Sequence, residues 1–251
     1  YQTGAFNQAS AEDLEKIFIG SKAGFAYSRI SNPTTATFER RISKLERGAG
    51  AVAFSSGMAA ISAAVMNIVE VGDEIISSAG LFGGTSDFFR ELKNFGIKVN
   101  YVTENRVENF AALLTDKTKL IYIETIGNPK LDVPDIAKLA ALAHENNLPL
   151  FVDSTVTTPY LVRPLNLGAD VVIHSTSKMI NGGGNSIGGI VVVGKNFRWD
   201  VDKFPKLAEF KSFGAMKYLA RLRAKVLAIL AVALPRSIFF SFVTFPFSIC
   251  S

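Results

Sequence analysis

Five short segments of the sequence place small, polar or ionisable residues directly after an apolar run. They are "SSGMAA" (55–60), "LFGGT" (81–85), "ETIGNP" (124–129), "DSTVTTP" (153–159) and "HSTSK" (174–178). Loops with a purely structural role would not need such residues after every apolar run. If the runs are parallel strands, these side chains meet at one edge of a sheet, where ligands gather in α/β proteins.

Lys178 ends the last of these segments, behind three small hydroxyl residues and ahead of a glycine run. It follows "ADVVIH", a pattern typical of a buried strand, so we expect its amine at a partly desolvated sheet end near other positive charge. Such surroundings disfavour the ammonium form. A neutral lysine amine can attack an aldehyde and form a Schiff base.

Two of the segments have the residue types that bind a phosphate monoester. Gly57 allows a tight turn before a helix, whose first amides then point at any anion placed there. Ser175 and Ser177 add hydroxyl donors at a second strand end. The P-loop pattern is absent. A Ser-Gly pair before a helix is also an ordinary cap, and that alternative stays open for Gly57.

Asp153 ends the fully apolar run "PLFVD". A carboxylate is costly to bury there unless a cation or strong donors meet it. It could cap a helix or pair with an arginine, or it could pair with a protonated pyridine nitrogen, which would lower the pKa of the carboxyl group. The lysine, this aspartate and the two phosphate-donor clusters converge on one cofactor, pyridoxal 5′-phosphate.

The elements that must position these residues alternate along the chain. The sequence predicts strands at 51–54, 74–78, 98–102, 119–124, 149–153, 170–175 and 188–193, and helices at 57–69, 85–95 and 134–147. Pro134 is expected in the first turn of the last helix. Continuous apolar strands that alternate with helices predict an α/β fold, a mostly parallel sheet covered on both faces.

Composition narrows the class of protein. Of 251 residues, 48% are hydrophobic, which excludes a disordered chain. The net charge of +5 arises in residues 195–225, and we interpret "AMKYLARLRAK" (215–225) as a solvated helix face rather than a nucleic-acid site. The single cysteine, Cys250, indicates a reducing compartment, so we expect a cytoplasmic protein.

Over roughly residues 1–225, these motifs resemble the cysteine/methionine-metabolism family of pyridoxal-phosphate enzymes, fold type I. The resemblance implies a three-layer α/β/α large domain in which Lys178 forms the Schiff base and Asp153 pairs with the pyridine nitrogen. It implies that Phe82, a tyrosine in many relatives, stacks on the cofactor without supplying a hydroxyl. Cofactor-binding positions matched by the resemblance are Gly57, Met58, Asn128, Thr155, Ser175 and Ser177.

The segment "YSRISNPT" (27–34) resembles the one that lends a tyrosine and an arginine, here Tyr27 and Arg29, to the phosphate of a neighbouring subunit. The resemblance therefore implies a homotetramer with sites shared between subunits. We expect no nucleic-acid partner and no membrane partner.

"ETIGNPKLDVPDI", "TPYLVRPLNLGADVVIHS" and "NSIGGIVV" look most like the O-acetylhomoserine sulfhydrylase branch of the family. That branch implies a transferase of methionine biosynthesis and trans-sulfuration, which forms homocysteine from O-acetylhomoserine and sulfide by γ-replacement. The alternatives are a cystathionine γ-synthase, a methionine γ-lyase, or an inactive fragment that binds the cofactor.

The sequence suggests three parts: an arm (1–32), the cofactor-binding large domain (33–225) and an apolar tail (226–251) whose only charge is Arg236. The tail does not resemble the family's C-terminal domain, which supplies the arginine for the substrate carboxylate. It could be a membrane span interrupted at Pro235, a buried terminal segment or a frameshifted reading frame. We favour the frameshift and expect a fragment with weak or no activity.

The remaining unusual residues are interpreted as structural. His144 suits the C-terminal end of the 134–147 helix, and His174 is expected to be a hydrogen-bonded structural residue. Met179 is expected in the core. Two distant histidines and one cysteine do not make a metal site.

Overall fold

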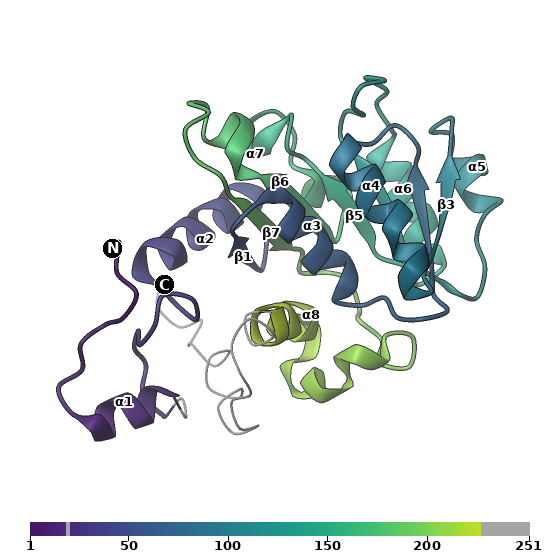
Figure 1. Ribbon diagram of the computed structural model, residues 1–251. Helices are drawn as coiled ribbons and strands as arrows, with labels where there is room; N and C mark the ends of the chain where they lie inside the picture. The colour runs from purple at the N-terminus through teal and green to yellow at the C-terminus, as the bar shows by residue number, and fades with distance from the viewer. Residues whose placement is uncertain (19–20, 227–251) are drawn as a thin grey trace.

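A seven-stranded sheet forms the centre of the protein, whose computed structural model describes residues 1–18 and 21–226 (Figure 1). The predicted tail, apart from Val226, lies outside the described residues. The strands are β1 (Gly50–Phe54), β2 (Glu74–Ser78), β3 (Lys98–Val102), β4 (Thr118–Glu124), β5 (Leu150–Asp153), β6 (Val171–Ser175) and β7 (Gly189–Val193). Each lies within one residue of its predicted range.

The strand order is β1-β7-β6-β5-β4-β2-β3. The ladder is parallel from β6 across to β3, and β7 runs antiparallel to both of its neighbours, β6 and β1. The mostly parallel sheet predicted from the sequence is confirmed. Because β7 is reversed, its first residues lie at the same edge as the last residues of β5 and β6.

Helices cover both faces of the sheet, as the α/β/α prediction requires. One face packs against α3 (Gly57–Met66), α4 (Gly83–Glu91) and the C-terminal segment with α8 (Lys217–Arg221). The other packs against α2 (Pro33–Glu46), α5 (Val107–Ala111) and α6 (Ile136–Glu145). The further helices and helical turns are α1 (Ala11–Phe18), α7 (Thr158–Leu161), η1 (Leu92–Phe95), η2 (Pro164–Leu167), η3 (Thr176–Ile180), η4 (Pro205–Met216) and η5 (Leu222–Val226).

The start of α6 differs from the prediction. Asp135 is the N-cap, and its Oδ1 accepts a hydrogen bond from the Lys138 N–H at 3.1 Å. Pro134 therefore precedes the cap instead of lying in the first turn. A side-chain cap satisfies an otherwise unpaired amide, which Pro134 has no group to do, so the cap decides where the helix begins.

The basic helix near residue 220 is not a solvated face, which corrects the interpretation of its charges. Arg221 donates to the Asn67 carbonyl and side-chain oxygens at 2.9 and 2.8 Å, and Arg223 donates to Glu39 at 2.6 Å. Lys217 donates to the Trp199 carbonyl at 2.9 Å. These cations anchor the C-terminal segment to the rest of the domain.

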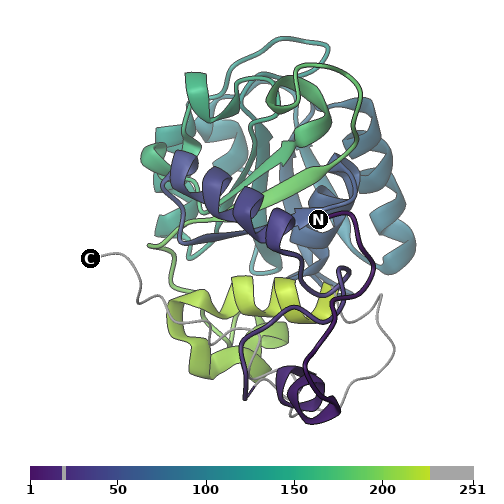
Figure 2. The same cartoon turned by 90° about the vertical axis from the view of Figure 1, so that its left-hand side faces the viewer.

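The N-terminal arm, which contains α1, lies away from α7 in both views (Figures 1 and 2). The arm folds on itself through an isolated bridge between Ala5 and Tyr27. In residues 1–18 and 21–226, no helix combines the length and the apolar character that crossing a bilayer requires.

Candidate active site

Three neighbouring parallel strands end in polar side chains at one edge of the sheet. Glu124, Asp153 and Ser175 are the last residues of β4, β5 and β6, and Glu124 lies opposite Asp153 in the ladder. Glu124 is 6% exposed and Asp153 is 8% exposed. Burial raises the pKa of both carboxyl groups above the usual range. This edge therefore holds two carboxyl groups that need a donor or a cation in order to ionise.

Thr155 links the ends of β5 and β6. Its N–H and its hydroxyl both donate to Asp153 Oδ1, at 2.9 and 2.5 Å. The same hydroxyl oxygen accepts from the Ser175 N–H at 2.8 Å. These bonds lower the pKa of Asp153 but do not outweigh its burial. The carboxyl group is thus held rigidly and gains from any further cation that reaches it.

Helix α3 begins directly against the end of β6. Ser56 caps the helix, with its Oγ accepting from the Ala59 N–H at 3.1 Å. A Cβ on Gly57 would lie 2.6 Å from Ser175 Cβ, so only glycine permits this approach. Among the described residues, none accepts a hydrogen bond from the Gly57 or Met58 amide. Both donors remain available to an anion, as the sequence predicts.

Lys178 lies in η3, the turn that follows β6. Ser177 fixes this turn: its hydroxyl donates to the Gly188 carbonyl at 3.2 Å and accepts from the Gly188 N–H at 3.0 Å. The Lys178 backbone departs from helical geometry, with φ −96° and ψ −121°. The Lys178 side chain is exposed, so the expected partial desolvation is wrong for the single chain. The turn carries Lys178 beyond the last residue of β6.

Phe82 lies in the loop before α4 and is attached to the strand ends. Its N–H donates to Glu124 Oε1 at 2.8 Å. Its ring lies close to Met58, because a Cβ on Gly84 would lie 2.8 Å from Phe82 Cε1 and 3.1 Å from Met58 Sδ. The Phe82 side chain is 44% exposed. An aromatic ring held in this way can stack on a planar ligand.

Sequence reasoning missed Glu124, although the signal was present. Glu124 ends the apolar run "KLIYIE" just as Asp153 ends "PLFVD". Burial, together with the neighbouring charge of Asp153, raises the pKa of Glu124 to about 8, against the lowering effect of the Phe82 hydrogen bond. Glu124 is therefore protonated over much of the neutral range and holds the Phe82 loop.

The raised pKa of Glu124 gives a testable dependence of stability on pH. Between its ordinary pKa of 4.5 and about 8, the folded chain keeps a proton that the unfolded chain has lost. Stability therefore falls as pH rises through this window, by up to about 1.4 kcal/mol per pH unit from this group. Urea unfolding of the cofactor-free Glu124→Gln variant is expected to show a shallower decline than the wild type. Parallel declines would contradict the assignment, and Glu108→Gln, at an exposed glutamate of α5, is the control.

The other predicted site residues lie at different distances from this edge. Asn128 is exposed and belongs to it, since its N–H donates to the Gly80 carbonyl, two residues before Phe82, at 3.2 Å. Tyr27 and Arg29 lie in the arm, with the Arg29 guanidinium 5.1 Å from the centre of the Tyr27 ring. The arm lies away from α7, the helix that follows β5 (Figures 1 and 2).

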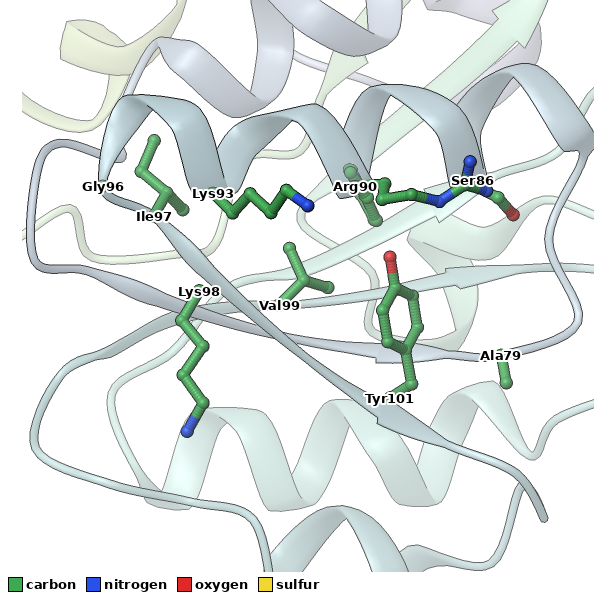
Figure 3. A pocket seen from close by; sticks show the side chains of 10 residues that line it. Ala79, Ser86, Arg90, Lys93, Gly96, Ile97, Lys98, Val99 and Tyr101 are labelled. Atoms are coloured by element: carbon green, nitrogen blue, oxygen red, sulfur yellow. The ribbon is translucent and has the colours of Figure 1, made fainter.

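A cavity of about 620 Å³ lies elsewhere, along α4 and the edge strand β3 (Figure 3). Arg90, Lys93, Lys98 and Tyr101 are among the residues that line it. None of the predicted site residues contributes to it. The cavity is a groove at the open edge of the sheet and is separate from the strand ends described above.

A sequence profile of the Cys/Met metabolism PLP-dependent enzymes matches residues 1–217. The chain belongs to this family. Its relatives include the O-acetyl-L-homoserine sulfhydrylase of Leptospira meyeri, 39% identical over 243 residues that cover 90% of this chain and 55% of the relative. The L-methionine gamma-lyase of Fusobacterium nucleatum subsp. polymorphum is 41% identical over 197 residues, covering 78% and 50%. The chain thus spans about half the length of the curated relatives it matches.

Solved structures of this PLP-dependent family share the fold. A Campylobacter jejuni protein assigned as an O-acetylhomoserine (thiol)-lyase superposes with a TM-score of 0.76 at 27% identity. The match covers 91% of this chain and 65% of that one, and that crystal holds N′-pyridoxyl-lysine-5′-monophosphate. The family and the fold class expected from the sequence are confirmed.

The strand-end residues of this PLP-dependent chain fit the family's cofactor. Gly57 lets the start of α3 pack against Ser175 at the end of β6, which brings two free helix amides next to the Ser175 hydroxyl, and Asp153 is a buried carboxyl group that could pair with a ring nitrogen. Each matches one polar end of pyridoxal phosphate. The donor set therefore agrees with the cofactor that the family uses.

Three of the residues interpreted as structural can be compared with the structure. Met179 is 63% exposed, so its expected place in the core is wrong, because η3 carries it outward with Lys178. His144 lies in the last turn of α6, where its hydrogen bond to Asp170 Oδ2 at 2.9 Å raises its pKa against the effect of burial. His174 is fully buried and hydrogen-bonded, as predicted.

Proposed function

We propose that the protein containing this chain is a pyridoxal-phosphate-dependent transferase that forms homocysteine from O-acetylhomoserine and sulfide. The observation that carries the proposal is the Thr155 link between Asp153 and the Ser175 backbone. It joins the carboxyl group that we assign to the ring nitrogen to the residue whose hydroxyl we assign to the phosphate, and that residue, Ser175, lies three positions before Lys178. The similarity to an O-acetyl-L-homoserine sulfhydrylase supports the choice of reaction.

The residues of the chain divide the binding of the cofactor between them. The Gly57 and Met58 amides and the Ser175 hydroxyl would donate to the phosphate, and each donor favours negative charge. The Ser177 hydroxyl, which donates to the Gly188 carbonyl in the cofactor-free chain, would have to give up that bond to join them. Asp153, kept in place by Thr155, would accept the ring N–H. Phe82 would stack on the ring, and Asn128 would contact its polar edge. When bound, pyridoxal phosphate withdraws electrons from the substrate and stabilises negative charge at the carbon that loses its proton.

Lys178 is the residue that moves protons. Its amine takes the proton from Cα of the substrate and returns a proton when the product is released. Across the reaction, the bond between Cγ and the acetate oxygen breaks and a bond between Cγ and sulfur forms. O-acetylhomoserine and hydrogen sulfide thereby give homocysteine and acetic acid, so atoms and charges balance.

The proposal also covers what lies outside one chain. Residues 1–32 act as an arm whose Tyr27 and Arg29 serve the phosphate of a neighbouring subunit in a homotetramer, and residues 33–225 form the cofactor-binding domain. The arm's position away from its own strand ends supports this division. Coverage of Lys178 by a neighbour would supply the desolvation that the single chain lacks. We place the protein in the cytoplasm.

Purified full-length protein tests the reaction directly. With pyridoxal phosphate and O-acetylhomoserine, it is expected to form homocysteine with sulfide at a higher kcat/KM than it forms cystathionine with cysteine. Homocysteine, a thiol, and cystathionine, a thioether, are separated by chromatography and identified by mass spectrometry. A preference for cysteine would indicate a cystathionine γ-synthase. Methanethiol release from methionine would indicate a γ-lyase, the alternative that the 41% identity to the Fusobacterium lyase favours.

A further inference from the structure

A second polar pair lies behind the strand ends. His174 Nε2 is 2.8 Å from Glu46 Oε1, and both side chains are 0% exposed. Glu46 is the last residue of α2, and His174 is the second-last residue of β6. His174 Nδ1 is 3.0 Å from the carbonyl oxygen of Ser154, the residue that follows Asp153. The pair thus joins α2 to the backbone next to the proposed ring-binding carboxylate.

The partners of His174 restrict where its protons lie. The Ser154 carbonyl can only accept, so His174 Nδ1 carries a hydrogen and donates it. Nε2 faces a carboxylate, which accepts when it is ionised. An imidazolium that donates from both nitrogens satisfies both partners, with Glu46 as the anion.

Stability alone does not explain this pair. A buried ion pair can often be replaced by apolar residues without loss of stability, because removing two charges from water offsets their attraction. Glu46 also leaves Oε2 buried without a hydrogen-bond partner, which costs further free energy. A polar pair kept at such cost is expected to have a use at the site.

The use is indicated by the position of the pair relative to Asp153. His174 lies on the α2 side of the sheet and Asp153 on the α3 side, with the Ser154 backbone between them. Ser154 is held by its own side chain, whose Oγ is 2.7 Å from Thr157 Oγ1, which in turn is 3.0 Å from Thr125 Oγ1. A positive charge on His174 therefore has a fixed place behind Asp153.

The other groups that face Asp153 favour its ionised form only through hydrogen bonds from Thr155 and Tyr122, and none of them carries a positive charge. Tyr122 and Glu124 approach from β4, and the negative charge of Asp153 contributes to the raised pKa of each of them. Thr155 donates two hydrogen bonds but is neutral. His174 lowers the pKa of Asp153, after Thr155 in size, against the larger effect of burial. Of the groups that lower the pKa of Asp153, His174 is the one that acts through a positive charge.

We propose that Glu46 and His174 form a positioning pair: Glu46 keeps both His174 nitrogens protonated, and that fixed positive charge keeps Asp153 ionised for the ring nitrogen. The inference rests on the proposed cofactor role of Asp153 and does not depend on the identity of the substrate. Glu46 and His174 do not touch the cofactor and act through Asp153.

Nitrogen NMR of ¹⁵N-histidine-labelled protein tests the protonation directly, without cofactor or substrate. In the wild type, both His174 nitrogens are expected to be protonated at neutral pH. In Glu46→Gln, a side chain of the same shape without the charge, one nitrogen is expected to lose its proton. A singly protonated His174 in the wild type would overturn the proposal. Because this measurement is made on the wild type, it does not depend on whether any variant folds.

Binding of pyridoxal phosphate to the full-length apoprotein, followed by absorbance without substrate, tests the coupling. Glu46→Gln is expected to weaken binding about tenfold, a factor equal to about 1.4 kcal/mol. The same change in an Asp153→Asn background is expected to have almost no effect, because the charge it acts on is absent. Equal effects in both backgrounds, or unchanged binding in the folded single variant, would overturn the proposal.

Two controls separate this inference from the cofactor assignment. His144→Gln disrupts the other histidine–carboxylate pair, His144 with Asp170, which lies at the opposite ends of the strands, and is expected to leave binding unchanged. Asp153→Asn alone is expected to weaken binding. If it does not, the cofactor role of Asp153 fails, whatever the protonation state of His174.

Discussion

Lys178→Ala is expected to abolish covalent attachment of pyridoxal phosphate and to lower homocysteine formation on the order of 10³-fold. In the proposed function the amine of Lys178 would both attack the cofactor aldehyde and take the substrate proton, and a positioned base contributes about 10²–10⁴-fold alone. The full-length protein is reduced with borohydride and digested. Mass spectrometry should then find the pyridoxyl group on the peptide that contains Lys178 in the wild type and nowhere in the variant.

A matched lysine distinguishes this role from general basicity. Lys195 is exposed, like Lys178. It follows β7, whose C-terminal end lies beside the N-terminal end of β6 and therefore away from the proposed site. Lys195→Ala is expected to keep the label and the activity. A label on another lysine in the wild type, or an undiminished label in Lys178→Ala, would contradict the assignment of Lys178 as the cofactor-binding lysine and the proposed mechanism that depends on it.

The strands were predictable because of how a buried parallel sheet is made. Strands such as β4 and β6 are covered on both faces, so they must be continuously apolar, and such runs stand out in a sequence. The direction of β7 was not predictable, because "GGIVVV" has the same apolar character in either direction. The start of α6 was missed by two residues because Asp135, and not Pro134, supplies the cap.

At the site, residue types were predictable and their environments were not. Asp153, Ser175 and Lys178 could be predicted as site residues because each of them follows an apolar run. The partner of His174 lies 128 residues away in the chain, so no local pattern could indicate Glu46. The exposure of Lys178 depends on the path of η3, which carries it outward from the end of β6. The position of a residue after an apolar run is enough to predict that it is a candidate site residue. Its burial and its hydrogen-bond partners depend on the packed fold and cannot be predicted in this way.

Gly57→Ala is expected to destabilise the domain by about 1–3 kcal/mol and to weaken binding of pyridoxal phosphate at least about tenfold. The added Cβ would lie 2.6 Å from Ser175 Cβ and 3.0 Å from Ser175 Cα, so α3 must move away from the end of β6. That movement would separate the Gly57 and Met58 amides from the Ser175 hydroxyl, which shares the phosphate with them in the proposed function. Thermal unfolding and a cofactor titration measure the two effects separately.

Two further variants decide whether the contact with Ser175 is the cause. Gly83 also opens a helix, α4, but a Cβ there meets nothing within 4 Å, so Gly83→Ala is expected to keep its stability. In Gly57→Ala/Ser175→Gly, the closest contact is removed, so stability should largely return while cofactor binding stays weak, because the Ser175 hydroxyl is also lost. A double variant no more stable than Gly57→Ala alone would show that the close approach of α3 to β6 is not what requires glycine at this position.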